Sequence, residues 1–455
     1  MRPTAKRRPA KPSSLRQDAR AIFEAGLAAV RADEAVRRAL RVEVTARGEV
    51  LACGRSRLAL RPGGRIIVVG AGKASARMAR AAERVLGRRI AGGCVVTSYG
   101  SAVLCRRVEI REAGHPAPDA AGAEAARRVG RWVDEAGRDD LVLCLISGGG
   151  SSLLPAPAEG LTLQDKRKVT AALLRRGAPI EALNCVRKHL SALKGGQLAR
   201  RAAPARVLVL LISDVVGDPL DVIASGPACG DPTTFADARA CLERYGAWRS
   251  APARVRWRIE AGMAGRLPET PSPADLPTAR VRHELLATND LALRAAAKRA
   301  RALGYRPLIL TRRLQGEARE AGAFLAARAG ESRADGRPLR PPACLLLGGE
   351  TTVTVRGRGL GGRCQELALS FAIHAGEGTN ACLLAAGTDG RDGPTPAAGA
   401  FGDGLVIQKA NDLKIDPRIY LSNNDAFRFF RRAGALFCTG PTGTNLMDLM
   451  VLLER

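Results

Sequence analysis

The first half of the chain alternates short, continuously apolar runs with longer segments in which apolar residues recur every three or four positions. Runs of the first kind are typical of strands buried on both faces, and segments of the second kind are typical of amphipathic helices. The strand candidates built on these apolar runs cover residues 65–71, 92–98, 141–152 and 207–218, and the helical patterns cover residues 75–86, 120–136 and 162–177. This alternation predicts a parallel sheet covered by helices on both faces.

The pattern weakens over residues 247–277, whose proline-rich end indicates a boundary between domains. A helix and a strand are expected within residues 282–310, and residues 343–355 read as two strands. Residues 362–375 read as a helix, and residues 381–404 as a strand that runs into a long glycine-rich loop. The whole chain therefore predicts two α/β domains with a cleft between them.

Composition narrows the class of protein. With 455 residues, 46% of them hydrophobic, the chain can form two or three domains with sizeable cores, and it has no uninterrupted apolar stretch long enough for a membrane span. The 11 cysteines form no C-x-x-C pair and several lie in apolar runs, which favours a cytoplasmic protein without structural zinc. Residues 1–17 are basic and lack the apolar core of a secretory signal, so we expect a disordered tail.

The formal net charge of +28 raises the question of nucleic-acid binding. The basic residues are spread along the whole chain, only 4% of residues are aromatic, and no nucleic-acid recognition motif is present. We therefore expect no nucleic-acid partner, and interpret the charge as a field that attracts small anions. A non-enzymatic nucleic-acid binder is the alternative that charge alone supports.

A lysine in a glycine turn is the first candidate for chemistry. The segment "VVGAGKAS" reads as a strand end, a turn with Gly70, Gly72 and Lys73, and a helix start. Such a turn presents backbone N–H groups and the positive end of a helix dipole, and Lys73 adds a full charge. It lacks the third glycine of a dinucleotide fingerprint, where Ser75 stands, and it does not fit a Walker A loop. We expect a phosphate or carboxylate here; the alternative is a solvated lysine and glycines that serve packing.

The segment "LISGGGSS" predicts a second anion-binding loop after a buried strand. Three glycines can form a nest of backbone N–H groups, and serine hydroxyls can donate to oxygens. The residues are Ser147, Gly148, Gly149, Gly150, Ser151 and Ser152. No G-x-S-x-G motif is present, so a serine nucleophile is not expected. A flexible turn is the alternative.

A basic stripe and a strand-end aspartate complete the first half. On a helix spanning residues 183–199, Arg187, Ser191 and Lys194 would share one face and suit an anionic substrate, unless the stripe is merely solvated. Asp214 follows the strand within residues 207–218, where a carboxylate can hold Mg²⁺ or, alternatively, cap a turn.

The second half adds acidic, cationic and amide side chains near the ends of predicted strands. They are Glu350, Arg363, Asp389, Asp392, Asn424, Thr442 and Asn445. Cations that steady a transferring phosphoryl group, a metal that neutralises its charge and a carboxylate that accepts the hydroxyl proton are the components of phosphoryl transfer. This residue set therefore favours a kinase.

Seven motifs in order resemble those of the glycerate 2-kinase family, whose C-terminal part is the MOFRL domain. They are "GAGKAS", "SGGGSS", "NxVRKHLSxxKGG", "SDVVGDPxDVIASGP", "GGETTVTVRGxGxGGR", "GTDGxDGPTxAAG" and "TGPTGTNxMDL". The resemblance covers about residues 18–453. It implies a Rossmann-like N-terminal domain over residues 18–255, a connecting α/β segment of the second domain over residues 256–342, and a MOFRL domain over residues 343–455.

The resemblance also implies an activity. In this family ATP, with Mg²⁺, phosphorylates the 2-hydroxyl of D-glycerate and gives 2-phosphoglycerate and ADP, at a site between the two domains. Lys73 and Arg363 match the proposed active-site cations of the family. From their positions at strand ends we assign Asp214 and Asp389 to metal binding or proton acceptance. We expect small-molecule substrates only, and a monomer or homodimer.

Three residues depart from the family pattern: Cys364 replaces a common asparagine, Ala426 a serine and Gly402 a larger residue. Cys364 bears most on the site, because it removes an amide beside Arg363. A nicotinamide-dependent hydroxypyruvate reductase is the alternative enzyme. The missing third glycine, Lys73, and the absence of an acidic residue in "RRIAGGCVV" to bind a ribose all count against it.

Overall fold

The computed structural model describes residues 14–455, which form two compact units. Unit 1 contains the N-terminal segment through Ala29, Asn289–Thr442 and Met447–Arg455, and unit 2 contains Val30–Thr288 and Gly443–Leu446. Each unit is therefore assembled from segments that are distant in the sequence. Of the predicted basic tail, residues 1–13 lie outside the described residues, and a helix begins at Leu15.

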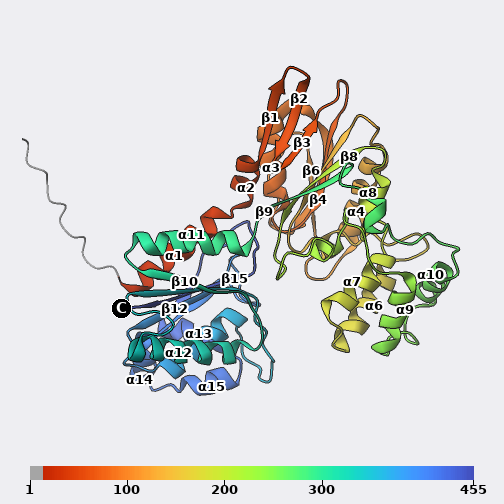
Figure 1. The fold of residues 1–455 in the computed structure, drawn as a ribbon. Coiled ribbons are helices and arrows are strands. Elements are labelled where there is room, and N and C mark those ends of the chain that lie inside the picture. The colour runs from red at the N-terminus through yellow and green to blue at the C-terminus, as the bar shows by residue number, and fades with distance from the viewer. Residues whose placement is uncertain (1–13) are drawn as a thin grey trace, which may run out of the picture. The chain divides into compact units, whose positions relative to one another are not determined.

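The centre of unit 2 is a six-stranded sheet in which every neighbouring pair is parallel (Figure 1). Its order is β6-β5-β4-β7-β8-β9, the 3-2-1-4-5-6 order of a doubly wound fold. The bounds are β4 (Ile66–Ala71), β5 (Ile90–Ser98), β6 (Glu109–Ala113), β7 (Leu141–Ile146), β8 (Arg206–Ile212) and β9 (Val281–Ala287). The predicted parallel sheet is confirmed, and its order reverses between β4 and β7.

One strand and one small sheet of unit 2 were not predicted. The edge strand β9 is only partly buried, so its mixed pattern does not look like a buried run. An antiparallel sheet of β1 (Leu40–Thr45), β2 (Gly48–Cys53) and β3 (Ser56–Ala59) precedes the parallel sheet. Its strands are short and its outer strand is largely exposed, which leaves little hydrophobic pattern to detect.

The helices of unit 2 fall into two groups. Helices α3 (Ser75–Leu86) and α4 (Ala120–Asp134) lie on opposite sides of the parallel sheet in Figure 1, and both match predicted helices. A separate cluster has its own apolar core and consists of α6 (Leu163–Arg175), α7 (Ile180–His189), α9 (Phe235–Arg244) and α10 (Ala253–Met263). The short helices are α2 (Ala32–Ala39), α5 (Gly150–Leu153), α8 (Gln197–Arg201) and the 3₁₀ turns η1 (Gly87–Arg89), η2 (Ile223–Ser225) and η3 (Pro273–Asp275).

Side-chain caps explain where several of these helices begin. The Thr162 hydroxyl accepts the N–H of Asp165, whose carboxylate accepts the N–H of Thr162 in return, and Thr234 and Asp237 repeat this capping box at α9. The box satisfies backbone donors that the first turn of a helix leaves unpaired.

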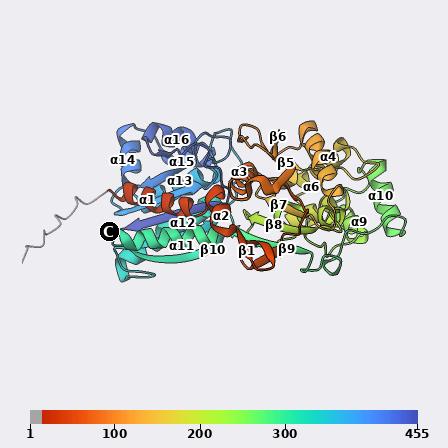
Figure 2. The ribbon, with the colours of Figure 1, turned by 90° about the horizontal axis from the view of Figure 1, so that it is seen from above.

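Unit 1 is built on a mixed six-stranded sheet with the order β10-β11-β15-β12-β13-β14, in which only β10 and β11 are parallel. Figures 1 and 2 show helices α1 and α11 on one face of this sheet and α12 and α13 on the other. The strands are β10 (Arg306–Leu314), β11 (Ala343–Gly349), β12 (Ala381–Gly387), β13 (Gly399–Asp403), β14 (Leu436–Phe437) and β15 (Asp448–Glu454). The helices are α1 (Leu15–Ala29), α11 (Asn289–Ala302), α12 (Ala318–Asp335), α13 (Arg363–Ala375), α14 (Gly404–Asp412), α15 (Pro417–Ser422) and α16 (Ala426–Ala433).

The second α/β domain was predicted correctly as a class but not in every element. Residues 343–355 form one strand, β11, rather than two, because the chain beyond Gly349 makes only an isolated bridge between Thr352 and Glu317. The loop expected after β12 contains a further strand, β13, whose Gly402 lies against the backbone of α13 near Ala368. Within the described residues, no helix is long and apolar enough to cross a membrane.

The contact between α12 and α13 gives a test of the fold of unit 1. A Cβ on Gly322 would collide with the Leu367 carbonyl and lie 2.8 Å from the Ser370 Cβ, whereas a Cβ on Gly330, in the same helix, would meet nothing within 4 Å. We expect Gly322→Ala to lower the free energy of unfolding by about 1–3 kcal/mol through overpacking. Gly330→Ala, its matched control, should raise it by up to about 1 kcal/mol through helix propensity. Chemical denaturation of both variants checks this, and equal effects would contradict the helix contact.

Candidate active site

The turns after β4 and β7 are hydrogen-bonded to each other at the point where the strand order of unit 2 reverses. The Lys73 N–H donates to the Gly148 carbonyl at 2.9 Å, and the Ala74 N–H donates to Ser147 Oγ at 3.0 Å. Ser75 Oγ and Ser147 Oγ are 3.1 Å apart, and both residues are buried. These N–H groups were expected to face an anion, but they donate within the protein. The turn therefore presents the Lys73 side chain and not a nest of backbone donors.

The glycines of the first turn serve close packing, which is the alternative that the sequence left open for them. A Cβ on Gly70 would collide with the Leu145 carbonyl, and a Cβ on Gly72 would collide with Ser147. Gly72 also has φ +149°, in a region that favours glycine. These glycines act indirectly, by letting the two turns approach each other.

The loop after β7 is the meeting point of the predicted residues in unit 2. A Cβ on Gly148 would collide with the Asp214 carboxylate and lie 2.6 Å from Asn445 Nδ2, which itself donates to Asp214 Oδ2 at 2.8 Å. A Cβ on Gly149 would lie 3.0 Å from His115 Nε2 and 3.4 Å from Lys73 Cγ. Lys73, Asp214 and Asn445 therefore surround two adjacent glycines.

His115 is a site residue that the sequence did not identify. It lies in "GHPAP", after the edge strand β6, and reaches Gly149 beside Lys73. A histidine between glycine and proline in a strand-end loop was the available signal. Asn445 was grouped with the second half of the chain, yet the structure places it in unit 2, where its partner Asp214 is 231 positions away.

The predicted basic stripe is only partly helical. Helix α7 ends at His189, so Ser191 and Lys194 lie in the turn that follows and not on one helix with Arg187. Ser191 Oγ donates to the Ala156 carbonyl at 3.1 Å, which makes it a loop-stabilising residue. Lys194 is nonetheless close to the loop after β7, because its Nζ donates to the Ser151 carbonyl at 2.9 Å.

The remaining serines and aspartates form hydrogen bonds and ion pairs within unit 2. Ser151 Oγ lies 2.8 Å from Ser225 Oγ, which donates to Asn184, and this links the loop after β7 to the helical cluster. Asp221 and Asp231 both accept from Lys188 Nζ at 3.3 Å. They form an ion-pair network away from the glycine loop.

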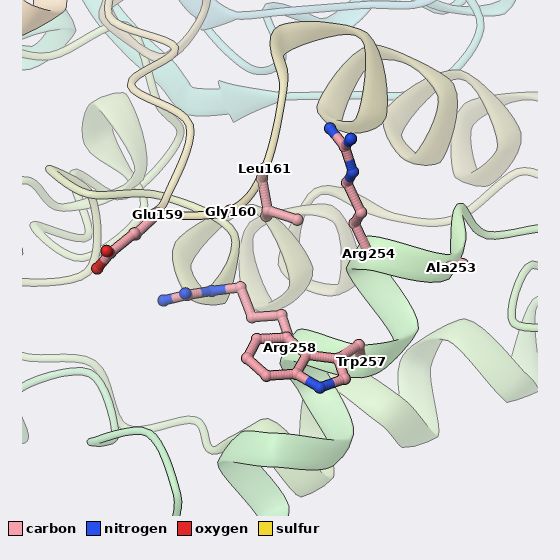
Figure 3. Close-up of a pocket in the computed structure, with 7 residues that line it drawn as sticks. All are labelled: Glu159, Gly160, Leu161, Ala253, Arg254, Trp257 and Arg258. Atoms are coloured by element: carbon pink, nitrogen blue, oxygen red, sulfur yellow. The ribbon is translucent and has the colours of Figure 1, made fainter.

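Two cavities of unit 2 differ in how many of the predicted site residues line them. The first, a cavity of about 390 Å³, is lined by Ser151, Ser152, Arg187 and Lys194, all predicted site residues. The second, shown in Figure 3, lies between the loop 159–161 and helix α10 and contains none of them. In Figure 3, Trp257 and Arg258 lie beside each other on α10, and Arg258 Nε donates to the His189 carbonyl at 2.9 Å. We therefore place the site at the first cavity and the glycine loop.

In unit 1, Arg363 opens helix α13 and is held by two carboxylates. Its Nε and Nη2 donate to Asp448 at 2.5 and 2.9 Å, and its Nη1 lies 2.9 Å from Glu350. Burial alone would lower the pKa of Arg363, but the hydrogen bonds and charge of Asp448 raise it, so the guanidinium stays charged. Asp448 was missed, although an acid at the start of an otherwise apolar last strand was a visible signal.

The helix start at Arg363 is also capped by a buried acid. Asp392 accepts the N–H groups of Cys364 and Gln365 at 3.1 and 2.8 Å. Burial, then the nearby charge of Asp448, raises the pKa of Asp392 to about 6. Cys364 is fully buried, and burial, together with Asp448 and Asp392, raises the pKa of its thiol well above the usual value. Cys364 therefore contributes its backbone N–H to the start of α13 and adds no reactive thiolate.

Asp389 and Thr442 lie together in unit 1, and Asn424 has a different role. Thr442 Oγ1 donates to the Thr388 carbonyl at 2.6 Å, and its N–H donates to the Asp389 carbonyl at 3.3 Å. A Cβ on Gly387 would lie 3.4 Å from Asp389 Oδ1 and 3.5 Å from Asp448 Oδ1, which places these two carboxylates near one another. Asn424 Oδ1 accepts the N–H groups at positions 356 and 357, and its Nδ2 donates to Glu366 Oε2 at 2.9 Å. It thus holds a loop.

The carboxylates fit a metal that arrives with a substrate better than a resident metal. Within the described residues, no group of three or more His, Cys, Asp or Glu side chains could hold an ion. Mg²⁺ bound to a nucleotide needs only one or two carboxylates, because phosphate oxygens and water complete its shell. Asp214, oriented by Asn445, and Asp389, beside Asp448, are carboxylates of this kind in units 2 and 1 respectively.

Comparison with known proteins identifies the family. Residues 18–260 match a family described as a domain of unknown function, DUF4147, and residues 343–448 match the MOFRL family. A D-glycerate 2-kinase of Thermotoga maritima is 47% identical over 85% of this chain and 90% of its own length. The chain belongs to the glycerate 2-kinase family.

Another curated relative and a solved structure extend the comparison. An Agrobacterium vitis protein that is provisionally named hydroxypyruvate reductase is 46% identical over 86% of this chain and 88% of its own length. The crystal structure of a Thermotoga maritima glycerate kinase matches with a TM-score of 0.84 and 42% identity, over 97% of this chain and 99% of that one. The similarity therefore extends through both units.

The buried cap of α13 makes stability depend on pH. Because the pKa of Asp392 rises to about 6 on folding, its stabilising contribution is complete below about pH 4 and is lost as pH rises through 6. We expect the unfolding free energy of the protein, relative to Asp392→Asn, to fall by roughly 1–3 kcal/mol between pH 4 and 7.5. Asp237→Asn is the control with the opposite slope, since hydrogen bonds from Thr234 lower the pKa of Asp237. Urea denaturation across this range checks it, and a constant difference would contradict the buried acid.

Proposed function

We propose that this protein transfers the γ-phosphoryl group of ATP to the 2-hydroxyl of D-glycerate, giving 2-phosphoglycerate and ADP. Membership of the glycerate 2-kinase family supports ATP-dependent phosphorylation of glycerate. The observation that carries the proposal in the structure is the convergence of Lys73, Asp214 and Asn445 on the glycines of one strand-end loop. Cations and a metal-binding carboxylate at such a loop suit phosphoryl transfer.

In the proposed reaction, residues of each unit have a role. The 2-hydroxyl oxygen forms a bond to the γ-phosphorus, the bond to the β–γ bridging oxygen breaks, and the hydroxyl proton passes to a carboxylate, for which Asp214 and Asp389 are the candidates. Lys73 and Arg363 stabilise the negative charge on the transferring group. Asp448 acts through Arg363, by fixing the plane of its guanidinium with two hydrogen bonds.

Mg²⁺ enters this proposal with ATP, as the ion that neutralises part of the phosphate charge when it is bound. Asp214 and Asp389 are the residues that would hold it, since each lies near the end of a strand with a polar partner. We propose a cytoplasmic enzyme whose partners are these small molecules, acting as a monomer or homodimer.

A hydroxypyruvate reductase is the second candidate, because one relative carries that name and the sheet has a dinucleotide-binding strand order. The first turn argues against it, since the N–H groups of Lys73 and Ala74 donate to the neighbouring loop and not toward a pyrophosphate. Strand β5 also ends at Ser98, without an acid that would bind a ribose. The kinase is therefore favoured.

The reaction and its position are tested by ³¹P NMR of the purified protein with ATP, Mg²⁺ and D-glycerate. We expect a new phosphomonoester resonance that matches added 2-phosphoglycerate. A resonance matching 3-phosphoglycerate would keep the kinase and overturn the position. No glycerate-dependent resonance, together with oxidation of NADH on adding hydroxypyruvate, would replace the kinase by the reductase.

The role of Arg363 is tested by its replacement. We expect Arg363→Ala to lower kcat by roughly 10²–10³-fold, the loss typical of a group that stabilises transition-state charge. The matched control is Arg418→Ala, at an exposed arginine of α15 in the same unit, which should stay within twofold. Because Asp448 loses its partner in the first variant, thermal melting must accompany the assay. A folded Arg363→Ala protein with near-normal kcat would remove Arg363 from the mechanism.

A further inference from the structure

The 390 Å³ cavity of unit 2 is lined by basic side chains and by no acidic one. It lies between the loops after β6 and β7 and the helices α6 and α7. Four of the residues that line it are basic, Lys166, Arg167, Arg187 and Lys194, and none is acidic. Salt bridges occur throughout the described surface of this protein, so a hollow lined by cations alone stands out from its surroundings.

The two lysines are buried and anchored to one loop. Lys194 is 2% exposed, and its Nζ donates to the carbonyls of Ser151 and Leu154 at 2.9 and 2.6 Å. Lys166 Nζ donates to the Pro155 carbonyl at 2.6 Å. Burial lowers the pKa of Lys194 to about 7 and that of Lys166 well below its usual value. Carbonyl dipoles alone therefore leave these ammonium groups poorly compensated, and an anion in the cavity would restore their charge.

Arg187 gives the strongest evidence for a ligand in this cavity. Burial lowers the pKa of its guanidinium, with no acid to offset the effect. Among the described residues, no hydrogen bond or ion pair is formed by its side chain. Arg187 is only partly exposed, and an arginine head in such a position gains from an anionic or carbonyl partner. Its donors are therefore open to a ligand from outside the chain, and an anion with several oxygens is the matching chemistry.

The opposite wall of the cavity is apolar. Pro116, Ala117 and Pro118 follow β6, Pro155 follows the serine loop, and Leu174 on α6 is 55% exposed. A small hydroxy acid has no apolar part that such a wall would cover. A nucleotide has both parts, a flat base that gains from leaving water and a chain of phosphates that needs cations. The volume is also of the order that a nucleotide requires.

The cavity shares one loop with the residues assigned to phosphoryl transfer. Ser151 and Ser152 line it, and Gly149, two positions earlier in the same loop, lies against Lys73 and His115. A phosphate chain that starts at Arg187 and follows this loop would lead to Lys73. The same loop thus contacts both the cavity and the reacting end of the site.

We propose that this cavity binds the nucleoside triphosphate co-substrate, with its phosphates against Lys166, Arg187 and Lys194 and its base against the proline loop and Leu174. This assignment rests on the proposed kinase function, since the nucleotide is its phosphoryl donor. It leaves D-glycerate to be bound elsewhere. Arg187 is a binding residue in this assignment, and Lys73 and Arg363 keep their roles in the transfer itself.

Nucleotide binding to the full chain tests this proposal without requiring turnover. The experiment is isothermal titration of the protein with a non-hydrolysable ATP analogue and Mg²⁺, alongside assays of KM for each substrate. We expect Arg187→Met, which keeps the apolar stem, to raise the Kd of the analogue about 10–100-fold while KM for D-glycerate stays within twofold. Arg175→Met, an exposed arginine of α6 outside the cavity lining, is the matched control and should leave both unchanged.

A second variant keeps the proposal testable if the loss of Arg187 disturbs folding. Leu174→Glu changes an exposed apolar residue of the same cavity, and it should also weaken binding of the analogue at least fivefold, because a charged side chain there replaces the apolar surface that covers the base. Inorganic tripolyphosphate should bind more weakly than the analogue, because it makes no use of the apolar wall.

Three results would overturn the assignment. An unchanged Kd for the analogue in folded Arg187→Met would show that the nucleotide binds elsewhere. A raised KM for D-glycerate with an unchanged Kd would make the cavity the acid site. Tripolyphosphate that binds as tightly as the analogue would show that the apolar wall does not bind the base. A protein that binds the analogue through Arg187 but forms no phosphoglycerate would overturn the kinase and leave the nucleotide site in place.

Discussion

The candidate site of unit 2 depends on how closely three strand-end turns approach one another. A side chain at Gly72 would collide with Ser147, and one at Gly148 would collide with Asp214. With hydrogen at both positions, the turns after β4, β7 and β8 come into direct contact, and the hydrogen bond between Lys73 N–H and the Gly148 carbonyl fixes their register. The place of Lys73 and Asp214 follows from that packing. The glycines therefore matter for the chemistry because they let the turns approach one another, and the N–H of Gly72 donates within the protein, to the Val96 carbonyl.

A different constraint governs unit 1, where the site is built from buried charge. Asp448 is fully buried, and the fork of hydrogen bonds from Arg363 compensates it. Removing one partner of such a pair typically costs about 3–5 kcal/mol, because the remaining charge stays in the interior. Asp392 beside them responds with a raised pKa. The arginine assigned to transition-state charge is thus also part of the structural core, and its two roles separate only when stability is measured with activity.

The sequence predicted what depends on neighbouring residues and missed what depends on distant ones. Buried parallel strands and amphipathic helices follow from local periodicity, so β4, β7 and β8 begin within one residue of the positions expected, although the candidates for β7 and β8 extend six residues into the turns that follow. The edge strand β9 was missed because half-exposed strands carry polar residues. The pairing of Asn445 with Asp214, and of Arg363 with Asp448, joins residues 231 and 85 positions apart, which no periodicity encodes. His115 and Asp448 carried weak local signals in the sequence, but it is such contacts that place them, with Lys166, beside the candidate site residues.

The large positive charge of the chain shows why composition identifies a binding site poorly. Many arginines sit on exposed helices in pairs such as Arg20–Glu24 and Arg294–Asp290, both at 2.7 Å, and contribute little beyond solubility. Arg187 differs from these residues, because it is a partly buried cation in a hollow whose lining contains no acid. Coulomb attraction to an anion is stronger there than at the surface, because the surroundings screen it less. A single uncompensated arginine in a cavity is therefore better support for an anionic ligand than the net charge of the whole protein.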